Sequence, residues 1–255
     1  MLRLLTPALR TLYGVFALAV FFVLLLLAAI LALVVPRLEW RRSVTSAVAR
    51  AALLVLGLRV SIDGLRHLPE GSCVVAANHA SYLDGIVLKA MLPPRFSFVI
   101  KREAASAPVL GLLLRRIGSE FVDRHDRGGR QRDARRVIKR AEQGHSLVFF
   151  PEGTFDGTPG LKRFHTGAFA AATRAEVPVV PAVIRGARRA LPNRALIVRP
   201  GRIAVEILES LPVAGATAES LREETRRRIL ARLDEPDLAP GAHASEACAS
   251  RQSAP

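Results

Sequence analysis

Cysteine is scarce in this sequence, with only Cys73 and Cys248 in 255 residues. Cys73 lies in an apolar run that is typical of a buried strand, whereas Cys248 lies in a polar stretch, so nothing supports a disulfide framework. The sequence also lacks CxxC and HExxH spacings, which would indicate a structural zinc site or a zinc protease. Half of the residues are apolar, and a chain of this length can be stabilised by a hydrophobic core instead.

Acidic residues are also few. Asp and Glu total 22 against 37 Lys and Arg, so the formal net charge is +15, and only four of the basic residues are lysines. Such a balance favours anionic partners. Lipid headgroups, phosphorylated substrates, an acidic carrier protein and nucleic acid all remain open on charge alone.

A long uncharged segment, residues 14–35, is the clearest feature that is present. As a helix its 22 residues would extend about 33 Å, close to the roughly 30 Å of a bilayer's hydrocarbon core. A signal peptide has a shorter apolar region of roughly 7–15 residues and a cleavage site, so a retained membrane helix is favoured. More arginines follow the segment than precede it, which predicts a cytoplasmic position for the domain that follows.

Residues 43–58 form a second apolar stretch at helical spacing. Arg41, Arg42 and Arg59 flank it, which predicts an amphipathic helix at the anionic headgroup layer. An ordinary core helix fits the same pattern. We assign residues 1–59 to an N-terminal membrane anchor.

The remaining chain alternates apolar runs with helical patterns. Five runs predict strands: 73–77, 96–100, 146–150, 179–184 and 203–208. Helices are predicted at 83–91 and 130–143. This order predicts one α/β domain over residues 60–234, with a mixed, largely buried sheet. The Ala-, Pro- and Ser-rich residues 235–255 predict a disordered tail.

The first candidate site is Asn78-His79-Ala80-Ser81-Tyr82-Leu83-Asp84. On a continuous helix, His79 and Asp84 would point about 140° apart. They can meet only if His79 lies in a turn and the helix begins near Ser81. A carboxylate on one imidazole nitrogen would then leave the other nitrogen as a general base. The alternative is a helix start in which Ser81 and Asp84 act as capping residues.

Three further segments place charged, polar or conformationally special residues near the end of a predicted strand. Gly118 to Arg124 ends in a forked cation, Phe149 to Thr154 ends in Glu, Gly and Thr, and Val177 to Gly186 carries two prolines. In the second of these, backbone amides near Gly153 can approach a ligand and Glu152 can orient a hydroxyl. The prolines of the third indicate an edge strand or an irregular wall. The simpler explanations are a solvated turn for the first segment, a simple turn for the second and an ordinary core strand for the third.

Together, in this order and behind an apolar segment, the four blocks NHASYLD, GSEFVDR, FPEGT and VPVVPAVIRG resemble the glycerolipid acyltransferase family. The resemblance covers roughly residues 60–210 and implies the HxxxxD motif of that family. It implies that His79 is the base, that Asp84 orients it, and that no covalent acyl-enzyme forms, consistent with the lack of a GxSxG motif. It further implies substrate binding by a set of five residues: Lys101, Arg124, Glu152, Gly153 and Thr154.

The resemblance also implies the substrates. A fatty acyl group would pass from acyl-CoA or acyl-carrier protein to a lysolipid at a membrane of the bacterial inner-membrane type, with no cofactor or metal. The acceptor expected from the family is 1-acyl-sn-glycerol 3-phosphate, giving phosphatidate. Phe155 stands where many relatives specific for that acceptor have Arg or Ser, which favours a lyso-aminolipid or another lysolipid as the alternative. A membrane-tethered nucleic-acid binder, a lipid-binding protein and a thioesterase fit the blocks less well.

Overall fold

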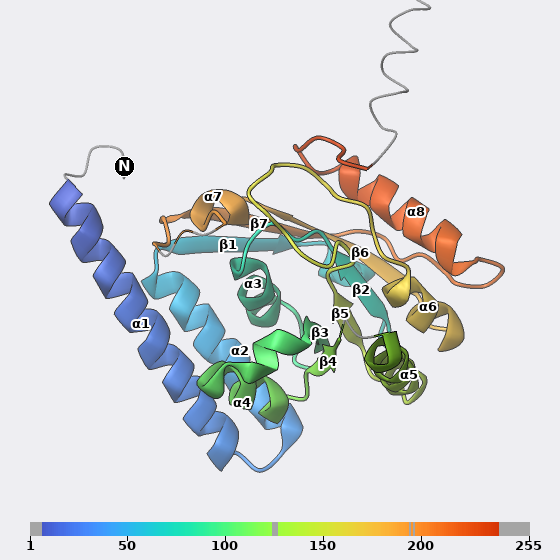
Figure 1. Cartoon of the computed structure of the whole chain (residues 1–255), viewed down its shortest axis with the longest axis horizontal. Coiled ribbons are helices and arrows are strands. Elements are labelled where there is room, and N and C mark those ends of the chain that lie inside the picture. Colours follow the sequence, from blue (N-terminus) through green and yellow to red (C-terminus); the bar gives the residue numbers. More distant parts are fainter. Residues whose placement is uncertain (1–6, 124–126, 194, 196, 240–255) are drawn as a thin grey trace, which may run out of the picture.

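A seven-stranded mixed sheet forms the centre of the molecule in the computed structural model, which describes residues 7–123, 127–193, 195 and 197–239 (Figure 1). The strand order is β1-β7-β6-β2-β5-β3-β4. The β6–β7 pair is antiparallel and the other pairs are parallel, so β1 and β7 run opposite to the remaining five. The predicted fold class is confirmed. The strands are β1 (Leu58–Asp63), β2 (Val74–Ala77), β3 (Ser97–Lys101), β4 (Glu120–Val122), β5 (Leu147–Phe149), β6 (Val179–Arg185) and β7 (Gly201–Ile207).

Helices cover both faces of the sheet. The first four helices lie on one side, and α5, α6 and α8 lie on the other (Figure 1). The bounds are α1 (Pro7–Val34), α2 (Leu38–Val55), α3 (Leu83–Met91), α4 (Pro108–Arg116), α5 (Arg127–Glu142), α6 (Gly167–Arg174), α7 (Ala187–Ala190) and α8 (Ala218–Leu230), with short 3-10 turns at Leu65–His67 and Arg102–Ser106.

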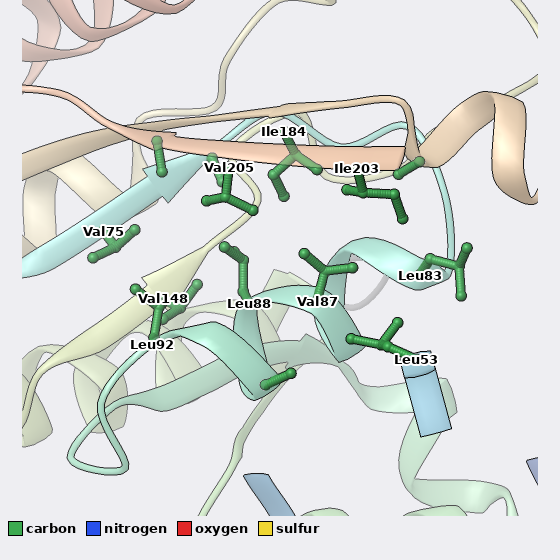
Figure 2. Packing of buried hydrophobic residues seen from close by; sticks show 14 of the residues in the cluster. Leu53, Val75, Leu83, Val87, Leu88, Leu92, Val148, Ile184, Ile203 and Val205 are labelled. Atoms are coloured by element: carbon green, nitrogen blue, oxygen red, sulfur yellow. The ribbon is translucent and has the colours of Figure 1, made fainter. Parts of the chain in front are cut away.

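The central strand β2 shows why its sequence is apolar without alternation. Successive side chains of a strand point to opposite faces. Val75 therefore packs beneath α3 while Val74 packs against α6 and α8, and both are fully buried. Figure 2 shows Val75 and Val148 of the sheet facing Leu88 of α3. Burial on both faces explains the continuous apolar runs from which the inner strands were predicted.

Pro178 precedes β6 and Pro181 lies within it, but they do not mark an edge, because β6 pairs with β2 on one side and β7 on the other. That half of the interpretation was wrong. Between the Val179–Leu211 bridge and the Ala182–Ile207 pair, the β7 side has one residue more than the β6 side. Pro181 lies in this irregular stretch, so the N–H that proline lacks is not needed for the ladder.

Helix α1 is long and apolar enough to cross a membrane, over Thr11–Val34. It nevertheless lies along the domain: the Tyr13 hydroxyl donates to the Leu56 carbonyl at one end, and Arg116 of α4 donates to the Ala32 and Leu33 carbonyls at the other. Only 22% of that apolar window is buried, so most of the helix presents apolar side chains outward. Large exposed ones include Leu12, Val15, Phe16, Phe22, Val23, Leu26, Ile30 and Leu33.

Helix α2 packs between α1 and α3, and it begins five residues before the predicted amphipathic helix. Its Arg42 is 6% exposed and donates to the Ile117 and Arg95 carbonyls and to the Ser97 hydroxyl. Arg42 therefore faces the protein interior and not lipid headgroups. Trp40 and Leu54 of the same helix are exposed, so α2 packs against the domain and also presents apolar side chains outward. Its position at the headgroup layer stays a prediction.

Lys89 of α3 provides a prediction on stability. Partial burial, together with Arg42 and Arg50, lowers the pKa of its ammonium group to about 7. Unfolded lysine keeps its proton to about pH 10, so the unfolded chain binds more protons above pH 7 and wild-type stability should rise with pH there. Lys89→Met should remove this rise and raise the melting temperature most below about pH 7. Thermal melts at acidic and alkaline pH, with exposed Lys139→Met as control, check it; an equal gain at both would contradict it.

Candidate functional site

The candidate site lies at the carboxyl ends of β2 and β5, which are neighbours in the centre of the sheet. His79 comes two residues after β2 and Glu152 three residues after β5. The carboxyl edge of parallel strands is the usual place for ligands in such sheets. Asn78 fixes the start of the loop, because its side-chain amide donates to the Ile184 carbonyl (3.0 Å) and accepts from the Ile184 N–H (2.7 Å) of β6.

His79 and Asp84 meet, as the turn hypothesis requires. The distance from His79 Nδ1 to Asp84 Oδ2 is 2.9 Å, and helix α3 begins only at Leu83. Asp84 Oδ2 also accepts from the backbone N–H groups of Ala80 (2.7 Å) and Ser81 (2.8 Å). The carboxylate therefore acts at the helix start and on the imidazole at once, so the two alternatives describe one arrangement.

Asp84 is completely buried, and its Oδ1 has no hydrogen-bond partner within the described part of the chain. Since a buried carboxylate oxygen accepts, His79 Nδ1 must carry the proton. The tautomer is thereby set, and Nε2 keeps the lone pair that a general base needs. The His79 side chain is 18% exposed, so this nitrogen remains within reach of a substrate.

Glu152 is buried beside this pair. One carboxylate oxygen accepts from the His79 backbone N–H (2.6 Å) and the other from the Lys162 backbone N–H (2.9 Å). Burial raises the pKa of the Glu152 carboxyl, and these two amides oppose the rise. Both oxygens are thus engaged by the chain itself. Glu152 therefore joins the His79 turn to the loop at Lys162. That it also orients a substrate hydroxyl stays a prediction.

Two aromatic rings enclose the imidazole. Phe150 stacks on His79 with ring centroids 4.2 Å apart, and Phe155 meets it edge-on at 4.5 Å. The exposed Tyr82 packs edge-on against Phe155 at 4.8 Å. From the sequence, Phe155 was interpreted only as the replacement of a cation, and no role was predicted for Phe150 or Tyr82. Phe150 could have been found, because it ends the apolar run just before Pro151 and Glu152.

The predicted substrate-binding residues lie on separate strands and loops. Lys101 ends β3 with an exposed side chain whose ammonium is 2.9 Å from Glu103. Gly153 and Thr154 begin the loop after Glu152, and the exposed Thr154 hydroxyl is 3.5 Å from the Phe155 carbonyl. Arg124 lies outside the described residues. In the described ranges no group of three His, Cys, Asp or Glu side chains could hold a metal ion.

A cavity of about 820 Å³ lies elsewhere, at the opposite edge of the sheet. Its lining includes Gly71, Pro94 and Gly144, which come shortly before β2, β3 and β5. Arg42 in this lining donates to two backbone carbonyls and the Ser97 hydroxyl, and Arg95 donates to backbone carbonyls. The cavity lies at the amino ends of the strands, whereas His79 lies at the carboxyl ends. This cavity is therefore separate from the His79 site.

Glu152→Gln tests the carboxylate between the two loops. The new amide nitrogen must face one of two backbone N–H donors, so at least one hydrogen bond to a charged group is lost, worth about 1.5–3 kcal/mol. We expect a loss of roughly 10- to 150-fold in turnover of the site's reaction. Glu223→Gln, on an exposed side chain of α8, is the matched control. Steady-state kinetics that show equal turnover for both variants would remove Glu152 from the site.

Comparisons with known proteins agree with this geometry. The acyltransferase family model matches residues 59–185. Human 1-acyl-sn-glycerol-3-phosphate acyltransferase alpha is 30% identical over 219 residues, which cover 81% of this chain and 76% of that protein. The lyso-ornithine lipid O-acyltransferase of Rhodobacter capsulatus is 38% identical over 136 residues, 52% of this chain and 46% of the relative.

The human beta enzyme is 32% identical over 170 residues, 64% of this chain. The chain spans 49–59% of the length of that enzyme and of two plant chloroplast relatives. A crystal structure of the 1-acyl-sn-glycerophosphate acyltransferase PlsC from Thermotoga maritima shares the fold, with a TM-score of 0.72 at 22% identity over 94% of this chain and 96% of that one. On the family model and the alpha relative together, the chain belongs to the glycerolipid acyltransferase family.

Proposed function

We propose that this protein transfers an acyl group from a thioester donor to the free hydroxyl of a lysolipid. The observation that carries the proposal is the 2.9 Å contact between His79 Nδ1 and the buried Asp84 carboxylate, which leaves Nε2 as a base at an accessible edge of the sheet. His79 and Asp84 are the proposed catalytic residues.

The proposed reaction uses one base and no covalent enzyme intermediate. His79 Nε2 takes the proton from the acceptor hydroxyl as its oxygen attacks the thioester carbonyl carbon. The carbon–sulfur bond then breaks, and the imidazolium returns the proton to the departing thiolate, which leaves as CoA or as the thiol of an acyl-carrier protein. Asp84 stabilises the imidazolium that exists between the two proton transfers. Their charges are opposite, and the carboxylate is shielded from water, which strengthens the attraction.

For the acceptor we propose 1-acyl-sn-glycerol 3-phosphate, which would give phosphatidate. Lys101 ends β3, at the same carboxyl edge of the sheet as His79, and Arg124 follows β4 in the sequence. A guanidinium matches a phosphate in geometry as well as charge. The human alpha and beta relatives carry this acceptor in their names. Gly153 and Thr154 are the proposed acceptor contacts on the neighbouring loop.

A lyso-aminolipid or another lysolipid is the second candidate acceptor, and one observation favours it. Phe155 occupies the space directly against the His79 ring, and the nearby Lys162 ammonium is 2.5 Å from Asp156. Neither residue therefore offers an unpaired cation to a phosphomonoester. The Rhodobacter relative is named for lyso-ornithine lipid, which lacks that phosphate.

The experiment is an acceptor and donor matrix with the full-length protein in membranes. Acyl-CoA and acyl-carrier protein are each supplied with lysophosphatidate, glycerol 3-phosphate, other lysophospholipids and a lyso-aminolipid. Thiol release in step with ester formation supports acyl transfer, and the best acceptor identifies the substrate. Thiol release that ignores every lysolipid would instead indicate a thioesterase.

We propose that the protein binds the membrane through the exposed apolar face of α1, with the site on the cytoplasmic side of a bacterial-type inner membrane. Apolar burial is not screened by ions, so we expect the protein to pellet with membranes and to resist extraction by high salt. Detergent should release it. Sedimentation of washed membranes measures this, and complete extraction by salt alone would contradict an inserted α1.

A further inference from the structure

The loop from Gly153 to Lys162 carries the ring that closes over the base. Phe155 of this loop packs edge-on against His79, on whose imidazole Phe150 also stacks. The loop has little regular structure of its own, since four of its ten residues are Gly or Pro. Asp156 joins parts of the loop, since it pairs with Lys162 and accepts from the Thr158 N–H, and further contacts reach the loop from outside.

The C-terminal strap, residues 235–238, supplies the first set of contacts. The Gly160 N–H donates to the Glu235 carboxylate (2.8 Å), the Leu161 N–H donates to the Pro236 carbonyl (2.9 Å), and the Leu238 N–H donates back to the Leu161 carbonyl (3.0 Å). Gly160 has a φ of +137°, and a Cβ there would overlap Leu238. The strap and the loop thus form a close two-way pairing. The folded part of the chain consequently includes residues 235–239, which were predicted to belong to the disordered tail.

Two arginines connect the strap to the rest of the loop. Arg188 pairs with Glu235 through two nitrogens (3.1 and 3.0 Å), and its third nitrogen donates to the Asp156 (3.1 Å) and Thr158 (2.9 Å) carbonyls. Arg226 pairs with Asp237 and donates to the Lys162 carbonyl (3.0 Å). These carbonyls stand on either side of Gly160, so the strap fixes both halves of the loop.

Two further hydrogen bonds connect the loop to the backbone of His79. The Lys162 N–H donates to Glu152, whose other oxygen holds the His79 backbone N–H. We infer that the C-terminal strap, through the Glu235–Arg188 pair, is a positioning element that keeps Phe155 against His79, so that a lysolipid hydroxyl and not water reaches Nε2. This inference rests on the proposed function. It adds Arg188 and Glu235 to the residues that determine the outcome of the reaction, although neither contacts the imidazole.

Glu235→Gln in the full-length protein tests it. Glutamine can still accept from the Gly160 N–H, but the charge that holds Arg188 is lost. A displaced Phe155 should lower transfer to lysolipid by about tenfold, because misplacement of groups near the reacting atoms is costly. Hydrolysis of the donor without lysolipid should stay constant or rise, so the ratio of hydrolysis to transfer should increase at least tenfold. Arg188→Lys, which keeps charge but loses the two-pronged contact, should behave alike, and Glu223→Gln should change neither rate.

Hydrogen exchange gives a readout that needs no substrate. Amides of residues 153–162 should exchange faster in Glu235→Gln than in the wild type and the Glu223→Gln control. Unchanged exchange, or transfer and hydrolysis that fall together in parallel with the melting temperature, would overturn the inference and leave the strap a structural element. Absence of transfer by the wild type would instead refute the proposed function, and the exchange comparison would still decide whether the strap holds the loop.

Discussion

Replacing His79 with alanine is expected to lower the rate of acyl transfer by about 10²- to 10⁴-fold, the usual contribution of a general base. The imidazole is held on three sides, by Asp84 at Nδ1, by Phe150 on one face and by Phe155 at an edge. The other two donors to Asp84 Oδ2 are the backbone N–H groups of Ala80 and Ser81, which cannot act as bases. The measurement is kcat for ester formation with the best donor and acceptor of the matrix.

The control for this variant is His145→Ala. His145 lies before β5, at the other edge of the sheet, and lines the separate cavity there. The same side chain is removed in both variants, so a general effect of losing histidine would appear in both. Membrane binding and the melting temperature should remain close to wild type in His79→Ala, because Asp84 keeps the backbone N–H groups of Ala80 and Ser81 as partners. Turnover near that of the wild type would exclude His79 as the base.

The five inner strands of this sheet were predicted from apolar runs, and the two edge strands, β1 and β4, were not among them. Strands β2, β5 and β6 are buried on both faces and appear in the sequence as apolar runs. Strand β1 alternates exposed and less exposed residues at the edge of the sheet, and it directly follows α2. Its first residue, Leu58, was therefore taken as the end of the amphipathic helix. Its position beside β7, about 140 residues later, comes from tertiary pairing with no local signal.

In the site, too, the local contacts were predictable and the long-range contacts were not. His79 and Asp84 are five residues apart, so the turn that joins them is local and its chemistry could be inferred from residue types. The contact of Glu152 with the His79 backbone N–H joins residues 73 apart. Backbone amides carry no sequence signature, so this role could not be predicted. The pairing of the strap with the loop was missed for a related reason, because its Ala- and Pro-rich surroundings suggested disorder, whereas two acidic residues there meet arginines from α7 and α8.

Asp84→Asn is expected to be nearly as damaging as the loss of His79, with turnover falling by about 10²- to 10⁴-fold. Asparagine can place its carbonyl oxygen where Oδ2 lies and keep the donors from Ala80 and Ser81, so the turn can persist. The negative charge is lost, however, and the imidazolium that forms during proton transfer is then unpaired in a dry environment. The defect should therefore concern the transition state and not the binding of either substrate.

The division between kcat and KM checks this expectation. Because Asp84 is completely buried and touches no surface that a substrate can reach, KM for donor and acceptor should stay near wild type while kcat falls. Asp63→Asn, which removes a carboxylate from the exposed end of β1, is the matched control and should leave both constants unchanged. If Asp84→Asn instead raised KM with kcat intact, or lost activity only in proportion to lost folded protein, then Asp84 would serve the start of α3 alone, and the base at His79 would act without it.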